Sequence, residues 1–191
     1  MLYKKIFRIV RDLICIVGLL LVAPVLFLAA IAIFIEDGRP IFFIQERIGK
    51  NKLIFKIFKM RTLKLAAPSV GTHELGQKYK LKSGKLIRKI KLDEFPQLIN
   101  VLKGEINLIG PRPGLVSQVN LMECREAKKI YDVKPGITGL SQVLGYDMSN
   151  PKKLAEIDKI YIEKKSVLID FLILASTFIS YPKKYLTKII K

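Results

Sequence analysis

Two adjacent carboxylates, Asp93 and Glu94, are the residues whose types most directly suggest catalysis. Adjacent side chains diverge on a helix or a strand, so this pair cannot share a proton as two facing carboxylates would. The two could instead take different tasks, one as a nucleophile and the other as a proton acceptor. At the start of a helix, the positive end of the helix dipole would keep Asp93 ionised, as a carboxylate nucleophile requires.

The same position also has a purely structural explanation. Asp is a preferred N-cap residue, and Pro96 suits the first turn of a helix predicted over residues 97–103. Judged from these residues alone, capping is the commoner role of such an aspartate. Both roles of Asp93 therefore stay open at this point.

Three other segments place cations or a stiff backbone where an anion could bind. In residues 111–113 two prolines hold Arg112 on a non-helical backbone, and its planar guanidinium suits phosphate. Lys59 and Arg61 alternate along a predicted strand, so both could face one anion. Residues 134–140 contain glycines that would let a ligand approach the backbone. Each segment has a structural alternative, namely a solvated turn, a basic strand edge or a simple loop.

The composition indicates a membrane-associated protein. The chain carries 34 Lys and Arg against 16 Asp and Glu, a net charge of +18, and half of its 191 residues are hydrophobic. This apolar content excludes a disordered polycation. Chains that are both very basic and very apolar usually divide these properties between a membrane and its anionic surface.

Several other classes of site and partner are disfavoured. Two cysteines, Cys15 and Cys124, form no disulfide framework, which favours a reducing compartment. A single histidine, His73, argues against a zinc site. The basic residues show no RNA-module signature, so no nucleic-acid partner is expected.

The membrane segment is predicted at residues 13–35, which contain no charge over 23 positions. A cleaved signal peptide is disfavoured, because the run is too long and no small-residue cleavage site follows. Both flanks are rich in Lys and Arg, and the positive-inside preference would keep both in the cytoplasm. We therefore predict a re-entrant helix-break-helix over residues 1–38, broken at Ala23 and Pro24. A spanning helix that tolerates the proline is the alternative.

The catalytic domain is predicted over residues 39–191. Apolar β-rich runs at 41–44 and 53–58 flank a turn, which predicts a β-hairpin, and residues 64–83 are predicted to form a loop. Ser83 is predicted to cap the first helix. Helices are predicted at residues 83–90, 97–103, 116–130, 152–164 and 166–181.

The last of these segments is interpreted as an interfacial helix, with a core helix as the alternative. The predicted fold class is α+β. It comprises a mostly helical catalytic domain with a small β-hairpin, the N-terminal re-entrant membrane helix and the interfacial C-terminal helix.

Five motifs follow one another in a fixed order. They are GRPIFF (38–43) followed by Gln45, Arg47 and Gly49, KMRT (59–62), LDEFPQLINVLKG (92–104), GPRP (110–113) and PGITGL (135–140). In this order and spacing, the chain from about Arg8 to Tyr181 resembles the small monotopic phosphoglycosyl transferases of the bacterial sugar transferase family.

The resemblance implies transfer of a sugar phosphate from a UDP-sugar to polyprenol phosphate, with release of UMP. Asp93 would attack the sugar-linked phosphorus and form a covalent phosphosugar–aspartyl intermediate, which favours catalysis over capping. Glu94 would activate or position the acceptor, and Mg²⁺, near or bound by Asp93, would neutralise the diphosphate. The implied phosphate- and substrate-binding residues are Arg88, Arg112, Lys59, Arg61, Pro111, Pro113, Gly136, Thr138 and Gln142.

The resemblance also implies a location in the bacterial inner membrane, with inner-membrane lipids as partners and the catalytic domain on the cytoplasmic face. Ala23 stands where the family usually has Ser, and Lys134 where it usually has Arg. Residues 145–151 are more similar to members that handle di-N-acetylated or other 6-deoxy amino sugars. The alternative function is a non-catalytic, membrane-anchored binder of anionic lipid or polyprenol phosphate.

Overall fold

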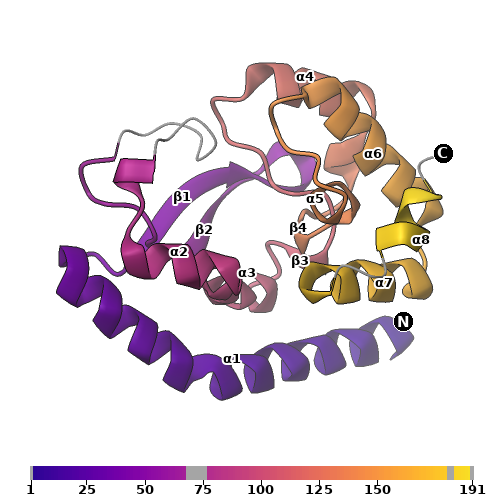
Figure 1. The fold of residues 1–191 in the computed structure, drawn as a ribbon. Helices are drawn as coiled ribbons and strands as arrows, with labels where there is room; N and C mark the ends of the chain where they lie inside the picture. Colours follow the sequence, from indigo (N-terminus) through magenta and orange to yellow (C-terminus); the bar gives the residue numbers. More distant parts are fainter. Residues whose placement is uncertain (1, 68–76, 180–182, 190–191) are drawn as a thin grey trace. The chain divides into compact units, whose positions relative to one another are not determined.

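The computed structural model describes residues 2–67, 77–179 and 183–189 (Figure 1). Helices dominate and two small two-stranded sheets accompany them, which confirms the α+β class. Contacts divide the chain into two compact units. Unit 1 comprises residues 1–45 and 57–102, and unit 2 comprises residues 46–56 and 103–191. The predicted boundary between a membrane segment (residues 1–38) and a catalytic domain (residues 39–191) stays a prediction. His73 lies outside the described residues.

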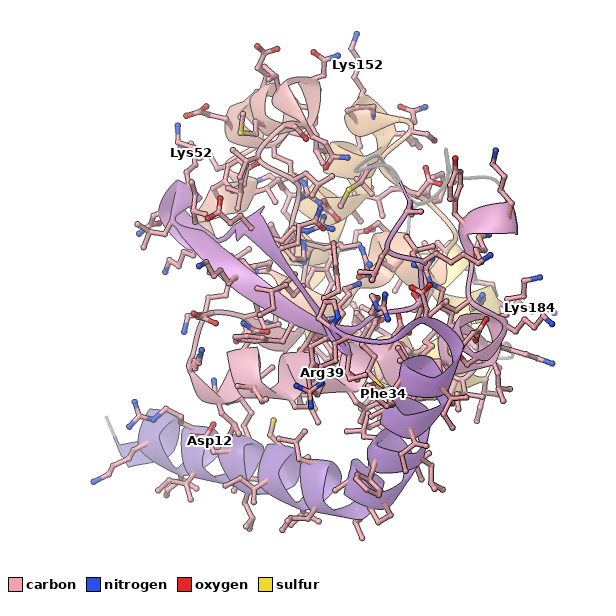
Figure 2. All side chains as sticks on the ribbon, turned by 90° about the vertical axis from the view of Figure 1, so that its left-hand side faces the viewer. Asp12, Phe34, Arg39, Lys52, Lys152 and Lys184 are labelled. Atoms are coloured by element: carbon pink, nitrogen blue, oxygen red, sulfur yellow. The ribbon has the colours of Figure 1, made fainter. Side chains whose placement is uncertain are left out.

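Helix α1 (Leu2–Asp37) contains the predicted membrane segment, with Pro24 inside it. Figure 2 shows that α1 is bent, because the part that carries Asp12 and the part that carries Phe34 run in different directions. A proline inside a helix removes one N–H donor and clashes with the preceding turn, which explains such a bend. The helix is continuous through the bend, and its re-entrant insertion stays a prediction.

Most of the apolar surface of α1 is not covered by the rest of the protein. Among the described residues, α1 is the only helix long and apolar enough to cross a membrane, and 11% of its most apolar window is buried. The buried part packs on α2 and α3, under which α1 runs in Figure 1. The core of unit 1 is made of Ala29, Ile33, Met60, Leu81, Ile87 and Leu92. The helix predicted to enter the membrane is therefore also a core helix of unit 1.

The predicted β-hairpin is confirmed. Strands β1 (Phe42–Ile48) and β2 (Ile54–Met60) pair, and the 3-10 turn η1 (Lys50–Lys52) joins them. The N–H of Gly49 donates to the carbonyl of Leu53 at 2.8 Å and closes the turn. Asn51 has a φ of 54°, the left-handed conformation that Asn tolerates well. Lys52, labelled in Figure 2, lies at this turn.

Helix α2 (Lys82–Lys89) begins with a cap that the sequence did not reveal. The prediction that Ser83 caps this helix is wrong, because Leu81 is the N-cap residue and Ser83 lies inside the helix. Glu36 of α1 supplies the acceptors instead. Its carboxylate accepts the N–H of Lys82 at 2.5 Å, and the N–H and hydroxyl of Ser83 at 2.9 and 2.7 Å. A carboxylate 46 residues away thus satisfies the first N–H groups of α2.

Beyond α2 the chain turns sharply at Lys91, whose φ of 58° is left-handed. The 3-10 helix η3 (Leu92–Gln97) follows, and α3 (Leu98–Leu102) continues it. The helix predicted at residues 97–103 therefore begins earlier than expected, as a tighter helix that contains Pro96. Within the predicted loop, the structure describes a 3-10 turn, η2 (Gln77–Tyr79), and a bridge between Leu63 and Lys80, whereas residues 68–76 lie outside the description.

Unit 2 contains a second sheet that was not predicted. Strands β3 (Asn107–Ile109) and β4 (Gly136–Thr138) pair in parallel, with Asn107 opposite Gly136 and Ile109 opposite Thr138. Strands of three residues are too short to show an alternating pattern, which explains why the sequence did not predict them.

Unit 2 is otherwise mostly helical. Its helices include α4 (Val119–Ala127), η4 (Ile130–Asp132), α5 (Leu140–Val143), α6 (Pro151–Lys164), α7 (Val167–Phe178) and α8 (Lys183–Thr187). Of these, α7 contacts both strands of the second sheet. The helix predicted at residues 152–164 is confirmed, and the one predicted at 116–130 is shorter. The core of unit 2 is formed by Leu140, Val143, Ile157, Tyr161, Ile173 and Leu186.

Candidate active site

Asp93 and Glu94 lie in the first turn of η3, in unit 1. The structural alternative, in which Asp93 caps the helix, does not apply, because Lys91 is the N-cap residue and Asp93 lies inside the helix. Asp93 is buried, with an exposed fraction of 9%. Asp93 is therefore shielded from bulk water at the start of a helix.

Glu94 diverges from its neighbour and reaches strand β2. Its Oε1 accepts a hydrogen bond from Nζ of Lys59 at 3.0 Å, and the two side chains are 17% and 14% exposed. The partial burial of this ion pair limits screening by water. The ion pair therefore links η3 to β2.

Asn100 fastens the strand that carries Lys59. Its side-chain Oδ1 accepts the backbone N–H of Phe58 at 3.2 Å, and Asn100 is fully buried in α3. Lys59 is the next residue along β2, so this bond fixes the backbone from which the lysine extends. Sequence reasoning gave Asn100 no role of its own, although a polar residue inside the apolar run of α3 is a usable signal.

Arg88 lies in the last turn of α2, and α2 packs against η3. Its Nε donates a hydrogen bond to Oγ1 of Thr62 at 2.6 Å. Unit 1 thus carries Lys59 on β2, Arg88 on α2 and the two carboxylates on η3. Helix η3 packs against α2 and is joined to β2 by the Lys59–Glu94 ion pair.

Arg61, which is predicted to share an anion with Lys59, contacts the end of α1. Its Nη1 donates to Oδ2 of Asp37 at 2.6 Å, and its Nη2 donates to the carbonyls of Asp37 and Gly38 at 3.0 and 2.7 Å. Arg61 is buried, and these bonds fasten it to the end of α1. Lys59 pairs with Glu94, whereas Arg61 pairs with Asp37. Phosphate binding by Arg61 stays a prediction.

In unit 2, the turn that carries Arg112 is held by one donor at each of four consecutive carbonyls, those of residues 111–114. The donors, in that order, are the N–H of Gly136 (2.9 Å), Nη1 of Arg125 (2.7 Å), Nη1 of Arg47 (3.1 Å) and the N–H of Ile48 (3.0 Å). Pro111 and Pro113 are buried, whereas Arg112 is half-buried. A backbone fixed in this way lowers the entropic cost of holding the Arg112 side chain in one direction.

Arg125 is itself held by a buried network. Its Nη2 and Nε donate to Oδ2 of Asp158 at 2.6 and 3.1 Å, and Ser141 donates to Oδ1 at 3.0 Å. Both charged side chains are 2% exposed. Burial raises the pKa of Asp158, while Arg125 and Ser141 favour its charged form. The sequence did not predict the Arg125–Asp158 pair, because the two residues lie on different helices and no local pattern indicates that they are in contact.

The remaining predicted site residues make contacts within unit 2. Gly136 permits β4 to approach β3, since an added Cβ would overlap the backbone of Gly110. The hydroxyls of Thr138 and Thr177 lie 2.9 Å apart. Gln142 donates from Nε2 to the carbonyl of Ile137 at 3.1 Å. Substrate contacts of these three residues stay predictions.

A tyrosine ties α6 to α7 in the same unit. Tyr161 donates to Oδ1 of Asp170 at 2.7 Å. Burial, and then this hydrogen bond, raise the pKa of Tyr161, so its hydroxyl stays protonated at neutral pH. The group therefore acts as a fixed donor between the two helices.

The described residues hold no cluster of three or more His, Cys, Asp or Glu side chains that could bind a metal ion. This donor set does not build a metal site from protein groups alone. Magnesium commonly binds through one or two carboxylates and through substrate phosphates. A carboxylate such as Asp93 fits that mode of binding.

Comparison with known proteins adds independent findings. A family model described as bacterial sugar transferase matches residues 2–184. An uncharacterized sugar transferase, EpsL, of Bacillus subtilis (strain 168) is 37% identical over 178 residues, which cover 93% of this chain and 86% of that protein.

Two further relatives have more specific names. A UDP-N-acetylgalactosamine-undecaprenyl-phosphate N-acetylgalactosaminephosphotransferase of Aeromonas hydrophila is 34% identical over 92% of this chain. A UDP-glucose:undecaprenyl-phosphate glucose-1-phosphate transferase of Caulobacter vibrioides (strain ATCC 19089 / CIP 103742 / CB 15) is 35% identical over 82% of this chain. The matches span 43% and 62% of these two proteins, less than two thirds of their lengths.

Removal of Asp158 tests the network behind the Arg112 turn. Asp158→Ala leaves the buried Arg125 without its carboxylate, so the free energy of unfolding is expected to fall by about 3–5 kcal/mol. Urea unfolding of the purified protein in detergent measures this. Glu156→Ala on the same helix is the control, because Glu156 pairs with Lys153 in solvent and its loss should cost about 0.5 kcal/mol. Equal losses in the two variants would contradict the importance of the buried pair.

Proposed function

The chain belongs to the bacterial sugar transferase family, and on that premise we propose that it transfers a sugar-1-phosphate from a UDP-sugar to polyprenol phosphate and releases UMP. Two relatives are named for reactions of undecaprenyl phosphate, one with an N-acetylgalactosamine phosphate and one with a glucose-1-phosphate. Because those two sugars differ, the names support the type of reaction, and they do not identify the sugar that this chain transfers. The sequence of residues 145–151 favours a di-N-acetylated or 6-deoxy amino sugar as the group transferred.

One observation carries this proposal. A buried aspartate and a glutamate paired with a lysine lie side by side in one helical turn, which packs against the helix that carries Arg88. Chemistry on a diphosphate needs a nucleophile together with cations that hold the phosphate oxygens. The same unit contains the long apolar helix α1, which suits an acceptor dissolved in a membrane.

The reaction proceeds in two displacements at the sugar-linked phosphorus. A carboxylate oxygen of Asp93 attacks this phosphorus, and the bond from phosphorus to the bridging oxygen breaks, so that UMP leaves with the electron pair. A phosphate oxygen of the polyprenol phosphate then attacks the same phosphorus, and the bond to Asp93 breaks. One phosphoanhydride replaces another, so the protein mainly has to position the donor and the acceptor.

The neighbouring residues have distinct tasks in this scheme. Burial of Asp93 limits the access of water, which would otherwise hydrolyse the phosphosugar–aspartyl intermediate. Glu94, held by Lys59, positions or activates the acceptor phosphate. Arg88 and Arg112 hold phosphate oxygens whose charge shifts during the transfer. Mg²⁺ bound by Asp93 and the diphosphate would supply charge neutralisation.

The membrane arrangement belongs to the same proposal. A re-entrant α1 keeps its basic flanks in the cytoplasm, and the active site then lies at the cytoplasmic face of the inner membrane. Helix α7 exposes Val167, Leu168, Phe171 and Phe178, each at 64% or more, which suits an interfacial helix. The donor would arrive from the cytoplasm and the acceptor from the lipid.

The activity itself is measured as UMP release. The purified protein, with Mg²⁺ and undecaprenyl phosphate, is incubated with a panel of UDP-sugars, and at least one of them is expected to yield UMP that depends on the acceptor lipid. Omission of the lipid is the control. Absence of UMP with every UDP-sugar, together with retained binding of polyprenol phosphate, would favour the non-catalytic binder.

The nucleophile is tested by Asp93→Asn. The amide cannot attack phosphorus, so UMP release is expected to fall below detection and no labelled sugar should remain on the denatured protein. Asp132→Asn is the matched control, since Asp132 is exposed in unit 2, and it should retain wild-type turnover. Near-normal activity of Asp93→Asn would end this assignment.

The re-entrant topology is tested with single cysteines in a background that lacks Cys15 and Cys124. Cysteines at positions 3 and 50 lie on the two sides of α1, and both should resist a membrane-impermeant maleimide in intact cells. Both should react after permeabilisation. Labelling of only one position from outside would show a spanning helix.

A further inference from the structure

Thr62 has no part in the chemistry described so far, although it touches a residue that does. It follows directly after Arg61 and is 4% exposed. Its Oγ1 accepts the Nε–H of Arg88 at 2.6 Å, a short hydrogen bond from a charged donor. The question is whether this contact only stabilises the fold or also directs Arg88.

The backbone of Thr62 is fixed against the helix that carries Arg88. The N–H of Leu81 donates to the carbonyl of Thr62 at 3.2 Å. A Cβ added at Gly84 would overlap that same carbonyl oxygen, so the helix approaches as closely as a glycine allows. Gly84 and Arg88 are four residues apart and share one face of α2. Thr62 therefore meets α2 at its first turn through the backbone and one turn later through the hydroxyl.

Both partners of this contact are also anchored to α1. Arg61, next to Thr62, is held by Asp37 and by the carbonyls at the end of α1. Glu36 holds the first turn of α2. The hydroxyl and the guanidinium thus lie on two segments that are both hydrogen-bonded to α1, which favours one direction of the bond between them.

We propose that Thr62 is a positioning residue for the transfer reaction, and this rests on the proposed function. The Nε–H lies in the plane of the guanidinium, so a bond to it sets the orientation of that plane. The terminal Nη groups of Arg88 are then directed toward the diphosphate of the donor. Without the hydroxyl, the guanidinium loses one of the bonds that set its orientation, and more of its ordering takes place during each turnover, at an entropic cost.

Three variants of Thr62 separate the hydroxyl from the methyl group. Thr62→Ser keeps the hydroxyl, Thr62→Ala lacks it, and Thr62→Val replaces it with a methyl group of similar size. Loss of the hydroxyl is expected to lower kcat/KM for the UDP-sugar about 10-fold to 100-fold, whereas Thr62→Ser stays within about threefold of wild type. Thr187→Val is the control, because the Thr187 hydroxyl bonds a carbonyl of its own helix. Thr187→Val should leave kcat/KM unchanged.

A double-mutant cycle with Arg88→Ala distinguishes positioning from general stability. If Thr62 acts through Arg88, Thr62→Ala should cause no further loss of kcat/KM in the Arg88→Ala protein. Additive losses would overturn the proposal, and so would equal activity of Thr62→Ser and Thr62→Ala. Thermal unfolding of each variant checks folding, and if Thr62→Val does not fold, the Ser and Ala pair gives the answer. Failure of the wild-type protein to release UMP would instead reject the proposed function.

Discussion

Two acidic residues at the end of α1 satisfy donors on three other segments of unit 1. Glu36 takes up the first N–H groups of α2, and Asp37 accepts from Arg61 and from the N–H of Leu65. Arg61 is buried, and a buried guanidinium is costly to leave without acceptors, so its bonds to Asp37 constrain where the segment after β2 can lie. The elements with the candidate catalytic side chains are thereby attached to the helix that is predicted to enter the membrane.

Unit 2 solves a similar problem with backbone carbonyls. A turn that contains two prolines has few N–H groups of its own, so neighbouring segments hold it through its carbonyl oxygens. Two of the four donors are arginines, and one of them, Arg125, is neutralised by a carboxylate in the interior. The charged groups of Arg47, Arg125 and Asp158 therefore have a structural role here. Only Arg112 in this turn is left half-buried with a side chain suited to an anion.

Local patterns in the sequence predicted much of this fold. The β-hairpin, the long apolar helix and α6 each have a run of apolar or capping residues that a neighbourhood of a few positions reveals. The pairing of β3 with β4, the capping of α2 by Glu36 and the Arg125–Asp158 pair depend on residues far apart in the chain. No periodicity encodes such contacts. The position of Asp93 could not be predicted for a similar reason. Its residue type suits an N-cap, but the left-handed turn at Lys91 starts the helix two residues earlier.

The double use of α1 has a consequence for how this protein can be handled and how it can evolve. Ala29 and Ile33 of α1 are buried in the core of unit 1, so a truncated chain that starts after the helix would expose their partners Met60, Leu81 and Ile87 to water. Deletion of α1 is therefore expected to destabilise unit 1 rather than to give a water-soluble enzyme. An exchange of membrane helices between relatives would have to keep residues 29–37, with their acidic end, as part of the enzyme.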